Sequence, residues 1–343
     1  MISQHKTVER EREMESFYAC LKAADQWNKY GYEVEFFWLS GVILVFVGFF
    51  GFAGNIATLF VLGQKKFRNK VFYNLLIELA CFDILSIVSL CVEVGYRSMA
   101  CTKKYVESVI DISYLIMNIG LCGSIYTTIA VSVERYLRMH FPTRGSYKRK
   151  SWMYITPVVS ITLVYNSPRF FKYHYSIVNG TLVTVSSNWT ETGVYEVVYV
   201  TWIQTFVESI IPMIILLFLN GSMIVKMYCS TKNDTDEIIN KKKDKKRKAT
   251  TKILFGIYFV FLLSHIPSSI VYMLDHFGRS ENVREKWYFL KPIEYLAVLF
   301  NSSINFVIYC LAGTKFRNEF YNLFRRKSSA TKISLNTTTV DNT

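Results

Sequence analysis

Residues 121–137 read LCGSIYTTIAVSVERYL, an apolar stretch that ends in Glu134, Arg135 and Tyr136. Ionisable side chains at membrane depth cost at least about 2.5–3.5 kcal/mol each, so they face a protein interior or a water-filled cavity. An arginine that is held by a neighbouring carboxylate can change partners when helices move. The three residues therefore predict a conformational switch at the inner end of a membrane helix, and they make a signalling protein the first hypothesis.

Long apolar runs recur along the whole chain of 343 residues. Each is close to the length of about 20 residues that spans a bilayer as a helix. The runs are apolar on most faces, whereas a helix of a globular protein carries its apolar residues in one stripe. We therefore predict an all-α membrane protein, a seven-transmembrane helix bundle. Its expected spans are Phe37–Leu62, Val71–Gly95, Val106–Leu137, Trp152–Phe171, Val197–Met227, Ile253–Leu274 and Tyr288–Leu311.

Lysines and arginines are distributed unevenly between the two sides of this predicted bundle. Of the 40 in the chain, 25 fall on the side that carries the C-terminus, and the net charge is +14. An excess of Lys and Arg marks the cytoplasmic side of a membrane protein. We therefore expect a multi-pass protein of the plasma membrane, with its N-terminus outside and its C-terminus in the cytoplasm. The basic run 241–252 fits a cytoplasmic loop near anionic lipid, so nucleic acid is not an expected partner.

The segments around the bundle differ in character. Residues 1–36 form a charged extracellular tail without an apolar signal segment, which leaves the first span as the expected insertion signal. The bundle is expected over residues 37–312. Residues 313–326 place apolar side chains on one face, as in an amphipathic helix on the inner leaflet. Residues 327–343 are polar and rich in hydroxyl groups, which predicts a disordered cytoplasmic tail, either phosphorylated or plain.

The predicted outer segments carry candidate covalent modifications. The sequons at Asn179 and Asn188 fall between the fourth and fifth spans, on the side where glycosylation occurs. Among the seven cysteines, Cys20 and Cys101 are the two placed clearly outside, where disulfides persist. Sequence does not test the geometry that a bridge requires. A Cys20–Cys101 disulfide and two separate thiols therefore both remain open.

Asp83 lies inside the second apolar run, where an unpaired carboxylate has to be neutralised or given a cation. Oxygen-bearing side chains are expected at a similar depth. They are Asn55, Ser124, Asn301, Ser302 and Asn305. Oxygen ligands around one carboxylate suit a small hard cation such as sodium. A hydrogen-bonded polar core without an ion explains the same residues equally well.

The order and spacing of these motifs resemble the rhodopsin-like class (class A) of G-protein-coupled receptors from about Phe37 to Arg326. Glu134-Arg135-Tyr136 matches the switch of that class. The run 305–309 resembles its Asn-Pro-x-x-Tyr, with Phe306 in the proline position. The resemblance implies that Asn305 and Tyr309 belong to the switch. It also favours a sodium ion near Asp83 as an allosteric modulator, with no other cofactor.

Spans three, five and six contain the residues that the resemblance assigns to signal transmission. Ile125, Pro212 and Phe261 fall where the class places its transmission cluster. His265 replaces the usual tryptophan two residues before Pro267, and a packed neutral imidazole and a titrating one are its two alternatives. Each proline removes a backbone hydrogen bond and permits a kink.

Within the class, the chain is similar to invertebrate FMRFamide-type neuropeptide receptors. The similarity rests on residues 123–128, 165–171 and 301–306. It implies an extracellular peptide ligand, amidated and RFamide-like. A heterotrimeric G protein is the implied partner at the cytoplasmic face, with arrestin and receptor kinases as further partners. A chemosensory receptor for an environmental small molecule is the alternative, and the motifs give no indication of an enzyme.

Acidic and aromatic side chains in the outer half are the candidate ligand contacts. A peptide arginine and an amidated phenylalanine suit such a lining through charge-assisted hydrogen bonds and ring stacking. Glu208 or Glu294 is the expected partner of the arginine, although a membrane carboxylate can also pair within the bundle. The candidate contacts are Met117, Asn118, Leu121, Gln204, Glu208, Asp275, Glu294 and Tyr295.

Overall fold

The computed structural model describes residues 42–68, 70–99, 105–141, 150–178, 181–187, 190, 195–231, 253–267, 269–270, 273 and 291–323. Several sequence-based predictions concern residues outside these ranges. They are Cys20, Cys101, Asn179, Asn188, Asp275, the N-terminal tail 1–36 and the C-terminal tail 327–343.

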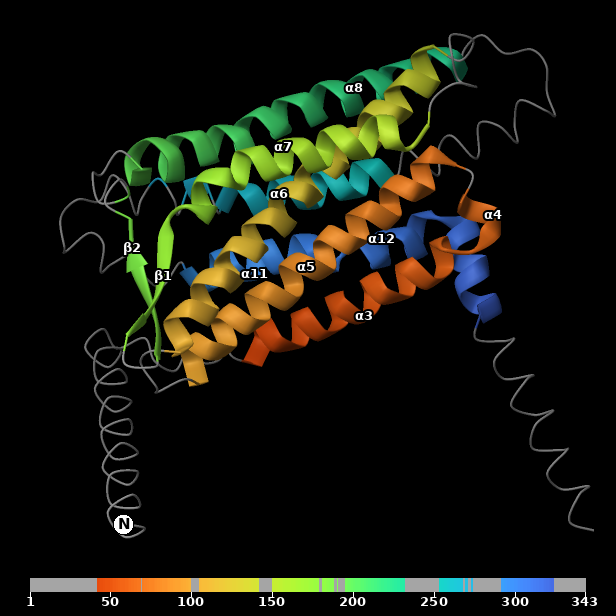
Figure 1. Cartoon of the computed structure of the whole chain (residues 1–343). Coiled ribbons are helices and arrows are strands. Elements are labelled where there is room, and N and C mark those ends of the chain that lie inside the picture. The colour runs from red at the N-terminus through yellow and green to blue at the C-terminus, as the bar shows by residue number, and fades with distance from the viewer. Residues whose placement is uncertain are drawn as a thin grey trace, which may run out of the picture.

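The described chain is almost entirely helical, and its long helices lie side by side (Figure 1). The helical elements are α3 (Leu44–Leu62), α4 (Lys65–Arg68), α5 (Val71–Met99), α6 (Tyr105–His140), α7 (Trp152–Phe170), η3 (Tyr195–Ile203), η4 (Thr205–Ile210), α8 (Ile211–Thr231), Ile253–Pro267, α11 (Lys291–Ser303), α12 (Asn305–Ala312) and residues 314–323. Five described segments have the length and hydropathy needed to cross a bilayer. These five segments, with the apolar helix Ile253–Pro267, agree with the predicted all-α membrane fold.

Helix α6 is the centre of the bundle, because α5, α7 and α8 all pack against it. Its 36 residues correspond to about 54 Å at 1.5 Å per residue, which exceeds the hydrocarbon core of about 30 Å. Its outer end reaches β2, and its inner end carries Glu134. One helix therefore connects the outer face of the molecule to the predicted switch.

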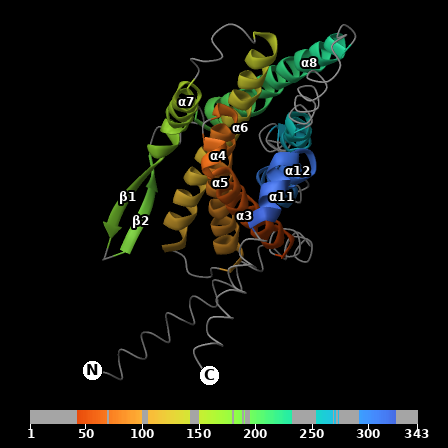
Figure 2. The same cartoon turned by 90° about the vertical axis from the view of Figure 1, so that its right-hand side faces the viewer.

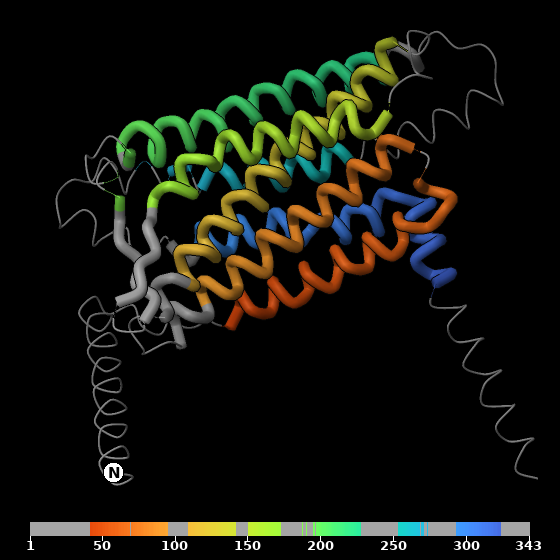
Figure 3. The backbone as a smooth tube through the Cα atoms, viewed as in Figure 1, coloured from red at the N-terminus to blue at the C-terminus, as the bar shows by residue number. Residues whose placement is uncertain are grey.

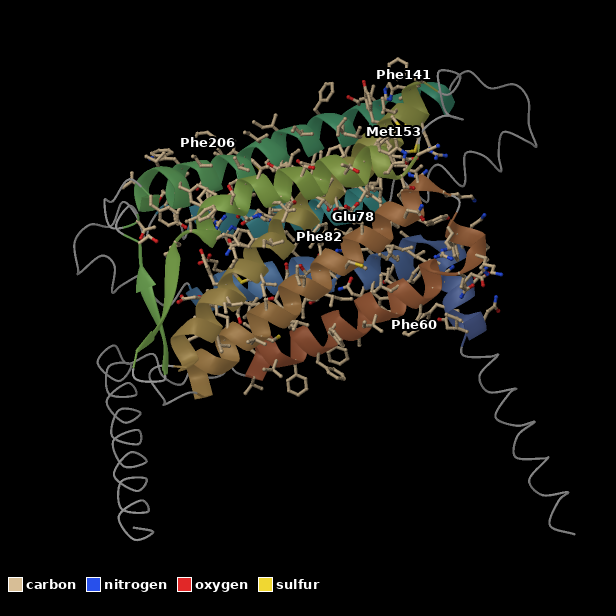
Figure 4. All side chains as sticks on the ribbon, in the orientation of Figure 1. Phe60, Glu78, Phe82, Phe141, Met153 and Phe206 are labelled. Atoms are coloured by element: carbon tan, nitrogen blue, oxygen red, sulfur yellow. The ribbon has the colours of Figure 1, made fainter. Side chains whose placement is uncertain are left out.

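Buried apolar side chains form an inner and an outer cluster. The inner one includes Leu79, Met223 and Ile257, and the outer one includes Ile125 and Leu299. Large apolar side chains also cover the outside of the bundle. Phe60 and Phe206, labelled in Figure 4, are 71% and 43% exposed. Apolar residues on both the inside and the outside are what a bilayer requires of its spanning helices.

A β-hairpin follows α7, which the sequence analysis did not anticipate. Strand β1 (Tyr173–Val178) pairs antiparallel with β2 (Thr181–Ser186), and Figure 2 shows the pair extending from the end of α7. Both strands are rich in the β-branched and aromatic residues that favour extended chain. Ser187 attaches the hairpin to the end of α7, because its hydroxyl donates to the Phe171 carbonyl over 2.8 Å.

The seventh predicted span is divided in the structure. Helix α11 ends at Ser303, and α12 begins at Asn305. No proline is present at the break, and Phe306, at the start of α12, contacts α3 and the helix 314–323. A Cβ on Gly54 would lie 2.9 Å from the Phe306 Cβ, and the Phe306 ring meets the Phe320 ring edge-on at 5.2 Å. Beyond α12 the chain turns into helix 314–323, which lies near α4 (Figure 3), and Lys66 of α4 forms an ion pair with Glu319.

Candidate functional site

The predicted switch at the inner end of α6 has one carboxylate and two arginines. Arg135 Nε lies 3.4 Å from Glu134 Oε2, while Arg138 Nε forms an ion pair with Glu134 Oε1. Helix geometry explains the second partner, because residues four apart face each other and adjacent residues do not. The expected pair is therefore a triad. Arg138 was missed, although its spacing of four from Glu134 was visible in the sequence.

Arg135 has a further contact that the motif did not predict. Its guanidinium carbon lies 3.5 Å from the centre of the Phe72 ring in α5. Such a stack is a cation–π interaction, and partial removal from water strengthens it. Tyr136 points elsewhere and stacks on His140, with the ring centres 4.2 Å apart. Of the three motif residues, only Arg135 therefore bridges α6 to α5 in these contacts.

Asp83 is fully buried between α5, α6 and α12, at the position where a polar pocket was expected. Ser124 Oγ donates to its Oδ1, and Asn305 Nδ2 donates to its Oδ2, both over 2.7 Å. Ser302, three residues before Asn305, is also fully buried beside Asp83, and its hydroxyl makes no well-formed hydrogen bond among the described residues. Asn301 is also buried. The pocket is thus a carboxylate with one hydroxyl, one amide and a spare hydroxyl oxygen.

Asn55 and Tyr309 are associated with this region in different ways. Asn55 Nδ2 donates to the Gly51 and Ser302 carbonyls, both over 2.9 Å, and so joins α3 to α11. Tyr309 is buried in α12, and its hydroxyl has no hydrogen-bond partner among the described residues. A buried hydroxyl without a partner is costly. It leaves Tyr309 free to gain a bond if the inner ends of the helices rearrange.

Three of the five predicted transmission residues are brought together around α6 and the sixth span. Ile125 and Phe261 are both buried in the outer core cluster. The His265 ring stacks on the Phe261 ring at a centre distance of 4.1 Å. The buried imidazole therefore packs where the sequence predicted either a packed or a titrating histidine. Pro267 is the last residue of the continuous described helix, Ile253–Pro267.

The outer half of span five is a π-helix, and Pro212 follows its end. Elements η3 and η4 run to Ile210, and α8 starts at Ile211. In the i→i+5 register of a π-helix, the Val207 carbonyl would accept from residue 212, but proline has no N–H. The Tyr126 hydroxyl donates to that carbonyl over 3.2 Å. The sequence predicted that Pro212 permits a kink; the structure shows a change from π-helix to α-helix immediately before it.

The candidate ligand contacts within the described ranges are mostly buried. Met117 and Leu121 belong to the outer core cluster, and Tyr295 packs against it. Asn118 donates to the Tyr114 carbonyl of its own helix over 2.7 Å. Glu294 is 5% exposed at the start of α11.

Glu208 and Gln204 are occupied by an arginine of the same chain. Arg169, at the end of α7, places its Nη2 3.9 Å from Glu208 Oε1 and donates from Nη2 to Gln204 Oε1 over 2.9 Å. Its Nη1 donates to Asn166 Oδ1 over 2.9 Å and to Tyr199 Oη over 2.8 Å. The pairing of Glu208 within the bundle was an open alternative, but Arg169 as the partner was missed. A basic residue inside the fourth apolar run was the available signal.

Comparisons with known proteins agree with this geometry. The family model described as "Serpentine type 7TM GPCR chemoreceptor Srw" matches residues 42–327. The chain is 26% identical over 85% of its length to an FMRFamide receptor of Drosophila melanogaster and covers 54% of that protein. It is 26% identical over 62% of its length to galanin receptor 2a of Danio rerio, covering 57%.

A third relative is the FMRFamide peptide receptor frpr-18 of Caenorhabditis elegans, which is 23% identical over 86% of this chain, with 70% of the relative covered. The chain spans little more than half the length of the first two relatives. The family model, in contrast, covers most of the chain and includes all the described helices. The chain therefore belongs to the Srw family of serpentine seven-transmembrane G-protein-coupled receptors.

Proposed function

We propose that this receptor responds to an extracellular neuropeptide that is amidated and RFamide-like. The observation that carries the proposal is the similarity over more than four fifths of the chain to receptors named for FMRFamide. The receptor acts at the plasma membrane with its N-terminus outside, which the excess of Lys and Arg on the opposite side supports. It is a receptor and not an enzyme.

The outer half of the bundle offers chemistry that suits such a peptide. Glu294 supplies a buried carboxylate at the start of α11, and Tyr295 beside it supplies an aromatic ring. Met117 and Leu121 add apolar surface from α6. A peptide arginine would bind the carboxylate through charge-assisted hydrogen bonds, and a phenylalanine ring would pack on the apolar side chains. Glu208 lies 3.9 Å from Arg169 of the same chain, so the peptide arginine is not expected to bind it.

Activation follows from a shift between two populations of the bundle. A peptide that binds better to the active state raises its population by its difference in affinity. The bundle then opens at its inner face, where Arg135 leaves Glu134 and Phe72 and a heterotrimeric G protein binds. Arrestin and receptor kinases are further partners at this face. Coupling of this kind is about 1–3 kcal/mol and reciprocal, so bound G protein tightens peptide binding.

The Asp83 pocket supports a sodium ion as an allosteric modulator. Asp83 supplies one negative charge, and the hydroxyls of Ser124 and Ser302 are oxygen ligands of the kind that hard cations prefer. The Ser302 hydroxyl is a buried polar atom beside Asp83 and would be a further oxygen ligand of the ion. Bound sodium would favour the state in which α5, α6 and α12 remain close to Asp83, and it would therefore oppose activation.

A chemosensory receptor for an environmental small molecule is the second candidate. The description of the matching family model supports it, because that model is named for chemoreceptors. The two candidates differ in the ligand and share the membrane topology and the cytoplasmic switch.

The deciding experiment is G-protein activation in a heterologous cell challenged with short amidated peptides, including Arg-Phe-amide endings. We expect a response at nanomolar concentration that is lost when the terminal amide is replaced by an acid. Silence across the panel, with surface expression confirmed, would exclude the RFamide ligand class and favour the chemosensory candidate. A response to the amide form that the acid form does not give distinguishes recognition of the amide from nonspecific binding of the peptide.

A further inference from the structure

Arg169 and Glu208 are opposite charges buried at the interface of α7 with span five. Their side chains are 3% and 5% exposed. A single charge in such surroundings is costly, and loss of one partner of a buried pair is more damaging than loss of both. At 3.9 Å the two groups attract without a direct hydrogen bond. Neither charge is accessible to a ligand in this arrangement.

Gln204 links the two charged groups. Its Oε1 accepts from Arg169 Nη2 over 2.9 Å, and its Nε2 donates to Glu208 Oε2 over 3.2 Å. Tyr199 is attached on the other side, since its hydroxyl accepts from Arg169 Nη1 and donates to the Tyr165 carbonyl over 2.6 Å. The arginine therefore reaches Tyr199 in η3, Gln204 at the junction and Glu208 in η4.

Only the π-helix brings these partners to one side. Tyr199 and Glu208 are nine residues apart, so in an α-helix of 3.6 residues per turn they would lie about 180° apart. In a π-helix the i→i+5 bonds bring residues four and five apart onto one face. The separations from Tyr199 to Gln204 and from Gln204 to Glu208 are five and four. Arg169 can therefore contact Tyr199, Gln204 and Glu208 together only while η3 and η4 are π-helical.

We propose that Arg169 is a positioning residue, the internal counter-ion of Glu208, and that it holds the outer half of span five in its π-helical form. Glu208 does not bind a cationic group of the ligand. The consequence for ligand recognition rests on the proposed function, whereas the pairing itself does not.

A double-mutant cycle on the full chain tests the pairing without any ligand. The variants are Arg169→Gln, Glu208→Gln and the two together, and the readout is the Tm of the detergent-solubilised receptor. We expect each single variant to have a lower Tm than wild type. The double variant should have a higher Tm than either single variant, because it leaves no unpaired buried charge. Arg169→Lys should fall between wild type and Arg169→Gln, because lysine keeps the charge but loses the planar fork. Arg68→Gln, which removes an exposed arginine, is the matched control.

Additive losses, with the double variant no more stable than the worse single variant, would overturn the pairing. If a single variant yields no folded receptor, surface expression replaces Tm as the readout. The same order of variants is then expected, and the same outcome would overturn the pairing.

Peptide potency then tests the ligand consequence. Similar losses for Arg169→Gln and Glu208→Gln support a positioning role. A loss confined to Glu208→Gln would show that the carboxylate binds the ligand. Absence of any peptide response contradicts only the proposed function, because the Tm cycle still decides the pairing.

Discussion

The two carboxylate oxygens of Glu134 contact different arginines: Oε2 lies near Arg135, and Oε1 pairs with Arg138. This arrangement determines how strongly Arg135 is held. The Arg138 contact is the closer one, so the carboxylate is anchored within α6 while Arg135 stays at 3.4 Å. An arginine held loosely by its acid depends more on its other contacts. In this receptor the other contact is the ring of Phe72 in α5.

Removal of the Glu134 charge is expected to raise basal signalling. Glu134→Gln keeps the shape of the side chain but removes the negative charge that lies 3.4 Å from Arg135 Nε, an ion-pair attraction of about 1 kcal/mol. The resting state then loses stability relative to the active one, and a shift of about 1.4 kcal/mol multiplies a rare active population about tenfold. Agonist-independent G-protein activation at matched surface expression measures the effect. Glu319→Gln removes another inner-face carboxylate and is the control; equal basal signalling in wild type and Glu134→Gln would contradict the switch.

Phe72 offers a separate test of how the resting state is held. Phe72→Leu preserves apolar volume but removes the ring face, with a loss of about 0.5–2 kcal/mol of cation–π attraction. We expect basal signalling to rise by several-fold in the same assay. Phe72→Tyr retains an aromatic face and should remain near wild type. If leucine and tyrosine behave alike, the stack seen beside Arg135 does not restrain it.

Helices α5 and α6 approach each other closely because glycines lie on the α6 face that meets α5. A Cβ on Gly120 would lie 2.7 Å from the Ser86 nitrogen and 2.9 Å from the Phe82 carbonyl oxygen, both backbone atoms. A Cβ on Gly123 would collide with the Phe82 ring. Small residues at such positions allow helices in membranes to pack by van der Waals contact. This packing also sets the distance between Asp83 in α5 and Ser124 in α6.

Gly120→Ala is therefore expected to destabilise the receptor by about 1–3 kcal/mol, as overpacking does in closely packed interiors. Backbone atoms cannot move aside as a flexible side chain can, so the two helices have to separate. The Tm of the solubilised receptor measures the loss. Gly221→Ala is the matched control, since among the described residues no atom beyond the backbone of its own helix lies within 4 Å of a Cβ there, and alanine favours a helix. An unchanged Tm for Gly120→Ala would show that the interface is looser than these distances require.

For most of the helix ends that the structure describes, the sequence predicted the boundary of the apolar span to within a few residues. Shorter features were not predicted. Val71 and Trp152 begin helices as predicted, because the change from polar to apolar sequence is abrupt there. The hairpin of β1 and β2 was missed, since two strands of six residues each give a weak pattern beside long apolar runs. The π-helix of η3 and η4 was also missed, because hydropathy does not distinguish helix types when all faces are apolar.

Arg169 shows why part of the candidate site could not be predicted. A lone arginine at the end of an apolar run often extends its charged end to the interface. Only the structure places it among Asn166, Tyr199, Gln204 and Glu208. Asp83 was easier, because a carboxylate in the middle of a span has to find polar partners. Two of the five expected partners, Ser124 and Asn305, donate to it directly.

Asp83 joins three helices that contribute to different parts of the receptor. Through Ser124 it reaches α6, which carries Glu134 at its inner end, and through Asn305 it reaches α12, which carries Tyr309. A movement of α6 or α12 relative to α5 would change at least one of these contacts. A cation bound at Asp83 would therefore bias the whole bundle even though it is distant from both the peptide and the G protein.

Sodium is accordingly expected to weaken agonist binding, and Asp83→Asn is expected to abolish the effect. The substitution keeps a side chain that can accept from Ser124 but removes the negative charge that would hold the ion. Agonist competition binding in sodium chloride and in N-methyl-D-glucamine chloride of equal ionic strength measures the difference. Glu78→Gln is the control, because it removes another carboxylate of α5 whose oxygens have no hydrogen-bond partner among the described residues. A sodium effect that survives in Asp83→Asn would place the ion elsewhere, and no sodium effect in wild type would leave Asp83 with a purely hydrogen-bonded role.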